Sequence, residues 1–220
     1  GMARSSAYHL IKVMIDEGFV THLPEEKRYG LGVAAFEVGS GYSRQAPLQR
    51  LARRPLAQLV DHVGQSAHLA VLHGRDALYL IEERAPGRPH LVTQVGVRLP
   101  AHLTASGRAI LAAAPAAQVS ALFPDAAAFS SRTGVGPASP SALKSLLVET
   151  RQRGHAAEEG EVTSGLASVA CAVLDHNDLP AAAVAVTYPS DGLTAAELDE
   201  VVTHVRRTTH DLSRRIGHHA

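Results

Sequence analysis

Two pairs of short apolar segments, each pair separated by a polar turn, constrain the fold of this 220-residue chain more than any other feature. Residues 67–72 and 77–81 flank a His-Gly-Arg-Asp turn, and residues 169–174 and 182–187 flank an Asp-His-Asn-Asp segment. Apolar runs of this length, bounded by turn residues, are typical of β-strands that pair through antiparallel hairpins. With a further strand candidate at residues 91–97, the sequence predicts a largely antiparallel sheet.

Helical patterns follow these strands, so helices are expected to flank the sheet. The predicted helices occupy residues 105–114, 115–122, 139–153 and 195–215. Ser139 and Thr194 suit the N-cap positions of the last two helices, and Gly154 suits a C-terminal stop. The section from residue 65 to the end is therefore predicted to be an α+β domain.

Residues 2–32 form a smaller section, in which a helix precedes a hairpin. Ser5 and Ser6 can cap a helix with apolar residues at helical spacing, and strands at residues 19–21 and 28–31 follow it. Only about five apolar side chains point to one side of that helix, and about 1.5–3 kcal/mol from each cannot offset the ordering entropy of the section. The section is therefore expected to need a packing partner that the chain as given lacks.

Residues 33–64 carry two helical patterns that meet at Pro47, which predicts linker helices between the small section and the domain at residues 65–220. The middle of this linker carries four arginines with no acidic residue between them, namely Arg44, Arg50, Arg53 and Arg54. A solvated or dimer-facing helix surface is favoured for these arginines over a position near DNA.

Charge balance and cysteine content exclude several classes of protein. The 21 basic residues balance 21 acidic ones, so any contact with DNA must be local. Apolar runs stay far below the roughly 18 residues that cross a bilayer, so we expect a cytoplasmic protein without a membrane partner. A single cysteine, Cys171, excludes a multi-cysteine zinc site, and the 13 histidines lack zinc-ligand spacing. We therefore expect neither a metal nor a cofactor.

Three stretches of the sequence resemble the IclR family of bacterial transcriptional regulators. Residues 4–12, 16–20 and 28–32 are similar to the recognition helix and wing of that family. Residues 98–112 resemble the strand, loop and helix at the edge of its effector pocket, and residues 153–173 resemble the acidic loop and strand that close the pocket. The stretches cover nearly the whole chain in the family's order, which makes the resemblance specific.

The resemblance implies a ligand-responsive transcriptional regulator and no catalysis. It implies a partial winged helix-turn-helix at residues 2–32, linker helices at residues 33–64, and a GAF/profilin-like effector domain at residues 65–220. The implied partners are a small organic effector, operator DNA and further copies of the chain, as a dimer or a dimer of dimers. Effector binding would shift the spacing of paired recognition helices and thereby change operator affinity.

The family has two more helices before the recognition helix, and these are absent here. A winged helix-turn-helix builds its small core from three helices, so the recognition helix is expected to expose its apolar face or pack elsewhere. Weak or absent specific DNA binding is expected for the chain as given. Either the start codon was assigned too far downstream, or the natural protein has lost DNA binding and serves as a sensory or interaction domain.

The resemblance places the DNA contacts at one end of the first helix and on the wing. The implied residues are Arg4, Ser5, Ser6, His9, Lys12 and Arg28. A helix N-terminus with serine hydroxyls suits a phosphate, an arginine can bond guanine, and a lysine supplies a point charge. The alternative is that the serines are only caps and the charges a solvated face.

The resemblance also implies a wall for the effector pocket. The implied residues are Leu99, Ala101, Thr104, Ala105, Ser106, Glu158, Ser168, Ala185 and Thr187. Free amides at a helix start can bind a ligand carboxylate, and hydroxyls can orient a small polar molecule. Some members with small-carboxylate ligands have cysteine in place of Ser168 and serine in place of Ala185, which favours a larger or partly aromatic acid here. The alternative is that these residues are caps and ordinary strand hydroxyls.

Three acids lie close together in the sequence, at Glu158, Glu159 and Glu161. Such a run is usually a solvated loop. If the acids are crowded, their like charges raise the pKa of one carboxyl, which could then share a proton or accept a bond from ligand hydroxyls.

An enzyme is the competing interpretation, with Ser106 as nucleophile near His102. The Thr-Ala-Ser-Gly-Arg sequence lacks the first glycine of a Gly-x-Ser-x-Gly elbow, and no orienting acid is identifiable. Cys171 lies in an apolar strand pattern, where a free cysteine behaves as a small buried hydrophobe. The sequence therefore favours a regulator over an enzyme.

Overall fold

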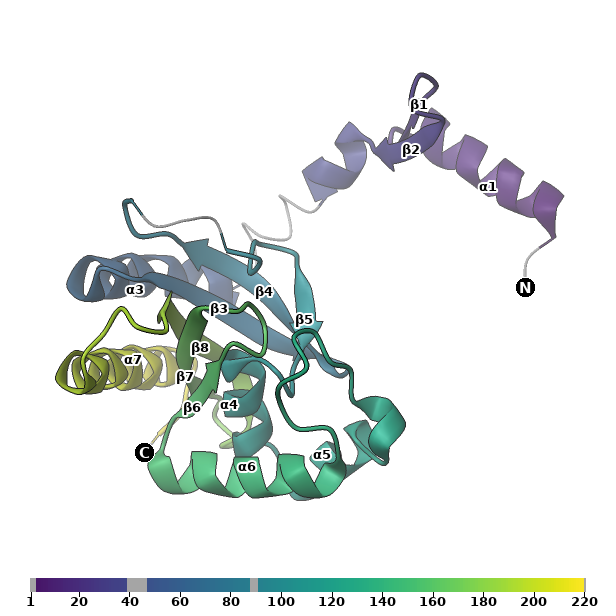
Figure 1. Ribbon diagram of the computed structural model, residues 1–220. Helices are drawn as coiled ribbons and strands as arrows, with labels where there is room; N and C mark the ends of the chain where they lie inside the picture. Colours follow the sequence, from purple (N-terminus) through teal and green to yellow (C-terminus); the bar gives the residue numbers. More distant parts are fainter. Residues whose placement is uncertain (1–2, 39–46, 88–90, 220) are drawn as a thin grey trace. The chain divides into compact units, whose positions relative to one another are not determined.

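The computed structural model describes residues 3–38, 47–87 and 91–219 (Figure 1). The chain divides into two compact units, residues 1–50 and residues 51–220. Within the described residues, the helices are too short or too polar to span a membrane.

The first unit is a helix followed by a β-hairpin. Helix α1 spans Arg4–Asp16, strand β1 spans Val20–Leu23, and strand β2 spans Arg28–Leu31 antiparallel to β1. Residues 33–38 form a further helical segment. The predicted helix and hairpin are confirmed.

The start of α1 differs from the predicted one. Ala3 occupies the N-cap position, and α1 has no side-chain capping bond there. Ser5 and Ser6 therefore lie inside the first turn, and the prediction that they cap the helix was wrong. An alanine side chain carries no acceptor for the amides of the first turn.

The apolar face of α1 is exposed. Leu10, Val13 and Met14 are 48%, 43% and 37% exposed, and every residue of α1 is at least partly exposed. The expectation that this helix exposes its apolar face is confirmed. These side chains are therefore far from the nearly complete burial that such residues commonly reach in a folded core.

The second unit contains a six-stranded sheet with the order β5-β4-β3-β8-β7-β6, in which every neighbouring pair is antiparallel. The strands are β3 (Ser66–His73), β4 (Asp76–Glu83), β5 (Arg98–Pro100), β6 (Ala156–Glu159), β7 (Leu166–Leu174) and β8 (Pro180–Pro189). Both predicted hairpins are confirmed, as β3 with β4 and β7 with β8.

Two edge strands differ from the predictions. Residues 91–97 do not form the predicted strand: a turn closes between Gln94 and Val97, with Gly96 at φ 86°, and the strand begins only at β5. At the other edge, part of the predicted acidic loop is strand β6. Glutamate has a low strand propensity, but pairing with β7 overrides it.

Helices cover both faces of the sheet. They are α3 (Pro47–Val63), α4 (Ala105–Ala113), α5 (Ala116–Leu122), α6 (Pro140–Arg153) and α7 (Ala195–Arg215), with a short 3₁₀ helix, η1 (Ala126–Ala128). The capping predictions are confirmed, since Ser139 and Thr194 accept from amides of the first turns of α6 and α7, and Gly154 is left-handed. Of the basic linker residues, Arg44 lies outside the described residues.

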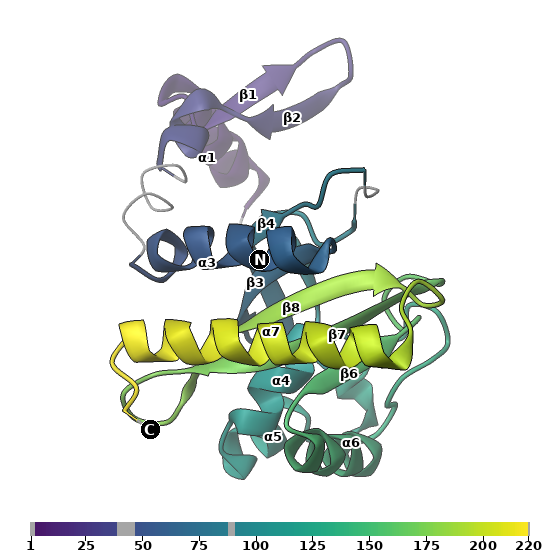
Figure 2. The ribbon, with the colours of Figure 1, turned by 90° about the vertical axis from the view of Figure 1, so that its left-hand side faces the viewer.

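Helix α4 lies against one face of the sheet, and α7 lies across the other (Figures 1 and 2). The contact between α4 and the sheet is built from small side chains. The buried residues of this cluster are Ala105, Ala109, Ile110, Ala156, Ala170, Ala183 and Ala185. Because alanines allow a helix to approach a sheet closely, the N-terminus of α4 is held next to strands β6, β7 and β8.

Candidate functional site

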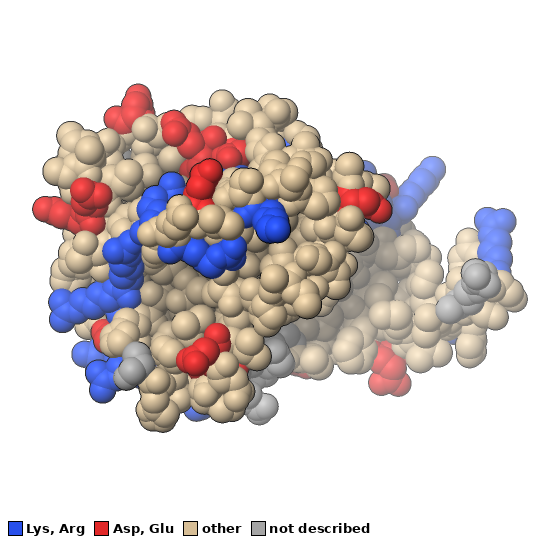
Figure 3. All heavy atoms as spheres, turned by 90° about the horizontal axis from the view of Figure 1, so that it is seen from below, with Lys and Arg blue, Asp and Glu red and all other residues tan. Residues whose placement is uncertain are grey.

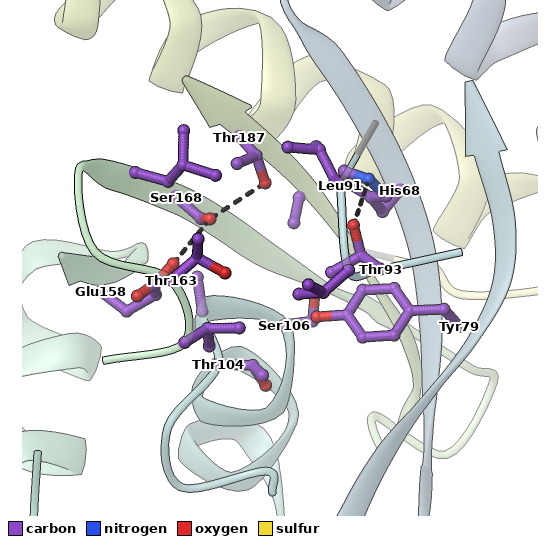
Figure 4. Close-up of a pocket in the computed structure, with 15 residues that line it drawn as sticks. His68, Tyr79, Leu91, Thr93, Thr104, Ser106, Glu158, Thr163, Ser168 and Thr187 are labelled. Atoms are coloured by element: carbon purple, nitrogen blue, oxygen red, sulfur yellow. Dashed lines mark hydrogen bonds between the residues drawn. The ribbon is translucent and has the colours of Figure 1, made fainter. Parts of the chain in front are cut away.

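A narrow cavity lies between the N-terminus of α4 and the sheet (Figure 4). It is lined by His68, Tyr79, Leu91, Val92, Thr93, Thr104, Ala105, Ser106, Glu158, Val162, Thr163, Leu166, Ser168, Ala185 and Thr187.

Strand register creates a polar row on the floor of this cavity. Glu158 of β6 is opposite Ser168 of β7, which is opposite Thr187 of β8. The Ser168 hydroxyl donates to Glu158 Oε1 at 2.8 Å and lies 3.0 Å from Thr187 Oγ1. Because the single proton of Ser168 goes to Glu158, Thr187 is the donor in the second bond. The row is thus polarised toward the carboxylate.

Glu158 is the end of this row and is 7% exposed. Burial and, to a smaller extent, the nearby Glu161 carboxyl raise the pKa of Glu158 to about 7, against the opposing effects of the Ser168 hydrogen bond and the Arg108 charge. The largest cause is burial rather than the crowding of like charges expected from the sequence. Among the described residues, Glu158 Oε2 has no hydrogen-bond partner, so the carboxyl can still accept a bond inside the cavity.

The first turn of α4 forms another wall. Thr104 caps the helix by accepting from the Gly107 amide at 3.0 Å, and Ala105 and Ser106 line the cavity. Ser106 is 1% exposed, and its hydroxyl finds no hydrogen-bond partner in the described part of the chain. The first amides of a helix have no partner within it, so this wall offers donors. Tyr79 points its hydroxyl toward Ser106 (Figure 4), and burial raises its pKa to about 12, so the phenol stays protonated.

His68 closes the opposite side of the cavity. It is fully buried, and burial lowers its pKa to about 4, so the imidazole is neutral near pH 7. His68 Nε2 shares a 2.8 Å hydrogen bond with Thr93 Oγ1, which fastens the segment before β5 to strand β3. His68 Nδ1 has no partner among the residues that the structure describes.

Seven of the nine predicted effector residues come together around the cavity, namely Thr104, Ala105, Ser106, Glu158, Ser168, Ala185 and Thr187. Leu99 and Ala101 are not among its lining residues. Leu99 packs with Ala70 and Tyr79, and Ala101 lies in the cluster below α4 with Leu111. The pairing of β5 with β4 at the sheet edge turns these two residues into the core rather than into the cavity wall.

Sequence reasoning missed His68, Tyr79 and Thr93. His68 carried a usable signal, because it is a polar residue in the middle of an otherwise apolar strand, and Tyr79 shares its face of the sheet. Thr93 carried none, since the irregular segment around it was interpreted as a strand.

The predicted DNA-contacting residues lie in the first unit and are all exposed. Ser5, His9 and Lys12 follow the i, i+4, i+7 spacing of one helix face, opposite the apolar face of α1. Arg4 and Ser6 flank that face in the first turn, and Arg28 begins β2.

The structure gives no geometry for the enzyme alternative. His102 Nε2 bonds to the Ser130 carbonyl at 2.9 Å, and its ring packs on Phe123 and Phe129. Burial raises the pKa of the Cys171 thiol to about 11, which disfavours a thiolate nucleophile. In the described ranges, His, Cys, Asp and Glu side chains form no group of three or more that could hold a metal ion.

The buried Glu158 and His68 are expected to give opposing pH dependences of stability. The His68 pKa falls on folding from 6.5 to about 4, so the unfolded chain binds more protons and this group makes stability rise with pH in that window. The Glu158 pKa rises from 4.5 to about 7, so this group makes stability fall with pH between those values.

In Glu158→Gln the opposing effect of Glu158 is removed. The free energy of unfolding of this variant is therefore expected to rise more steeply between pH 4.5 and pH 6.5 than that of the parent, by at most about 1.4 kcal/mol per pH unit. Urea unfolding at several pH values measures this slope. Glu149→Gln removes an exposed carboxyl of α6 and should keep the parent profile. A flat or falling profile in Glu158→Gln would contradict the assignment.

A small-molecule cavity on an antiparallel sheet, together with a helix and hairpin in a separate unit, defines the class of a ligand sensor joined to a DNA-reading module. The family model "Bacterial transcriptional regulator IclR C-terminal" matches residues 41–214. The glycerol operon regulatory protein of Streptomyces coelicolor is 32% identical over 219 residues, which cover 99% of this chain and 85% of that protein. The transcriptional regulator XynR of Escherichia coli is 29% identical, covering 100% of this chain and 87% of that protein.

A solved structure agrees with these sequence relatives. The crystal structure of the Thermotoga maritima IclR protein has a TM-score of 0.80 and 26% identity, and covers 99% of this chain and 87% of that one. The chain belongs to the IclR family of bacterial transcriptional regulators. It is a ligand-responsive regulator rather than an enzyme, and regulators of this family bind small-molecule effectors and DNA.

Proposed function

We propose that the cavity beside α4 is the effector site of this regulator. The observation that carries the proposal is the polar row of Glu158, Ser168 and Thr187, which ends in the cavity at a carboxylate oxygen with no partner among the described residues. A buried polar atom without a partner costs free energy, and a ligand that supplies the missing hydrogen bond recovers it. The first turn of α4, from Thr104 to Ser106, completes the site.

We further propose that α1 and the hairpin contact operator DNA. The residues in this role are Arg4, Ser5, Ser6, His9, Lys12 and Arg28, all exposed in the first unit. The regulator acts in the cytoplasm as a dimer or a dimer of dimers. Two recognition helices in such an assembly match two operator half-sites, and effector binding changes their separation.

Lys12→Ala is expected to weaken DNA binding without changing effector binding. The chain as given is expected to bind DNA only weakly, and loss of one phosphate contact should weaken this binding to DNA from the region upstream of its own gene still further and lower the slope of log affinity against log salt by about 1. Ligand binding in the second unit should be unchanged. Fluorescence anisotropy at several salt concentrations measures the slope.

A matched control is needed because other lysines and arginines also lie at the surface. Figure 3 shows Lys and Arg side chains gathered on one face of the molecule, and Lys144 on α6 is an exposed basic residue of the second unit. Lys144→Ala should leave the salt slope unchanged. Equal losses in Lys12→Ala and Lys144→Ala would show general electrostatic attraction instead of an interface on α1.

A further inference from the structure

We propose that the effector is an uncharged polyhydroxylated molecule of the polyol or sugar class, whose hydroxyl groups bond Glu158 Oε2 and the Ser106 hydroxyl. This inference rests on the proposed effector site and names its ligand class. It differs from the carboxylate or aromatic acid that the sequence suggested.

The lining of the cavity is rich in hydroxyl groups. Seven of its residues carry one: Tyr79, Thr93, Thr104, Thr163, Ser106, Ser168 and Thr187. Hydroxyls both donate and accept, so they match a ligand whose own groups do the same. The remaining apolar side chains are small or aliphatic, so they can cover the carbon chain of such a ligand.

Three buried polar atoms of the lining have no partner among the described residues: Glu158 Oε2, Ser106 Oγ and His68 Nδ1. Their residues are 7%, 1% and 0% exposed. An ionised carboxylate can only accept, while the serine can donate or accept. A ligand with several hydroxyls can donate to Glu158 and also bond Ser106. While Glu158 is ionised, a ligand whose only polar group is a carboxylate cannot bond both residues without placing an acceptor beside an acceptor.

Among the described residues that line the cavity, no side chain carries a positive charge that could neutralise an anionic ligand. Of the described lining residues, none is Lys or Arg, and the lining histidine is buried and neutral. Arg108 is nearby but already occupied, since it forms an ion pair with Glu161 and donates to the carbonyls of His102 and Ala157. A ligand carboxylate would therefore bring a second negative charge toward Glu158, and the described lining residues offer it only neutral donors, namely hydroxyl groups and the amides of α4.

An aromatic ligand finds little support in the same lining. Tyr79 is the single phenyl-type ring among the described lining residues, and it already makes an edge-to-face contact with the His68 imidazole, with 5.7 Å between the ring centroids and 84° between the ring planes. The two rings are nearly perpendicular, so the described lining offers no parallel pair of aromatic surfaces between which a ligand ring could stack.

The test compares polyols with the acids of the same carbon chain by calorimetric titration of the whole protein. Ribitol with ribonate, xylitol with xylonate, and glycerol with glycerate differ within each pair mainly in charge, and 4-hydroxybenzoate represents an aromatic acid. The polyols are kept at millimolar concentrations, because osmolytes at much higher concentrations stabilise proteins without binding to a site. We expect at least one polyol to bind about tenfold or more tightly than its acid at pH 8, where Glu158 is ionised.

Two variants locate the binding. Ser106→Ala should weaken the polyol about tenfold, because one hydrogen bond is lost while an alanine is well tolerated in a helix. Glu158→Gln should lower the ratio of polyol affinity to acid affinity about tenfold, because it removes the charge that repels the acid and weakens the acceptor. Glu149→Gln, on the exposed side of α6, should change neither quantity.

The outcomes separate this inference from the proposed function. If the acids or 4-hydroxybenzoate bind more tightly than every polyol and Ser106→Ala weakens them, the polyol class is overturned while the effector site stands. If no compound binds, or if Ser106→Ala changes no affinity, both the ligand class and the site are overturned.

Discussion

Replacing Arg108 by methionine is expected to lower the free energy of unfolding of the second unit by about 3–5 kcal/mol. Arg108 is 2% exposed, and its guanidinium pairs with Glu161 Oε1 at 2.9 Å. It also donates to the His102 carbonyl at 2.8 Å and to the Ala157 carbonyl at 2.7 Å. Methionine fills most of the volume but leaves the buried Glu161 carboxylate without its cationic partner and the two carbonyls without their Arg108 donors.

The site depends on the same contacts. Arg108 joins α4 to strand β6 and to the loop that carries Glu161, whose second oxygen accepts from the Glu159 amide. These elements bring Glu158 and the first turn of α4 to the cavity. Arg108→Met is therefore expected to weaken effector binding as well as stability, although Arg108 does not line the cavity.

Urea unfolding of the single and double variants measures the coupling. Arg108→Met with Glu161→Gln should be less destabilised than the sum of the two single changes, because the uncompensated charge is gone. Arg108→Lys should not restore the parent stability, since an ammonium group cannot reproduce the planar fork of donors. A loss below about 1 kcal/mol for Arg108→Met would mean that this ion pair contributes no more than a surface pair.

Gly107→Ala is expected to be the second severe change, with a loss of about 3 kcal/mol or more in the free energy of unfolding. A Cβ on Gly107 would lie 2.2 Å from the Ala101 carbonyl oxygen and 2.4 Å from its Cα. Both atoms are backbone, so a side-chain rotation cannot relieve the overlap. Alanine is otherwise the better helix former, so propensity alone predicts the opposite sign.

The overlap at position 107 should also disturb the cavity, because the Gly107 amide donates the hydrogen bond that Thr104 accepts as the N-cap of α4. If α4 moves away from Ala101, Ser106 moves relative to the strands, and effector affinity should fall together with stability. Gly30→Ala is the matched control, since its Cβ would meet Leu23 Cδ1 at an ordinary 3.5 Å. Equal stability of Gly107→Ala and the parent would show that the turn before α4 adjusts freely.

Local signals in the sequence predicted much of the fold. The caps at Ser139 and Thr194 and the left-handed Gly154 were recognisable, because each depends on residues within one helical turn. The two hairpins were equally local, since a few turn residues join strands that pair with each other. The prediction that Ser5 and Ser6 cap α1 was wrong because several neighbouring residues could begin this helix, and the local sequence did not distinguish among them.

Only part of the candidate site could be predicted from the sequence. Thr104, Ser106, Ser168 and Thr187 were found through the family resemblance, whereas His68 was not. Strand β3 is far from β8 in the sequence, and the register between these two strands decides which side chains of β3 become neighbours of the row on β6, β7 and β8. No short window of sequence contains that register.

What the sequence determined by itself is the order of most helices and strands, the family, and most of the hydroxyl groups around the cavity. The tertiary structure alone decided that the acidic segment forms edge strand β6, that Leu99 and Ala101 face the core, and that Arg108 pairs with Glu161. The physical reason is distance along the chain. Periodicity and capping act over a few residues, whereas burial, charge pairing and cavity shape arise where segments far apart in the sequence pack together.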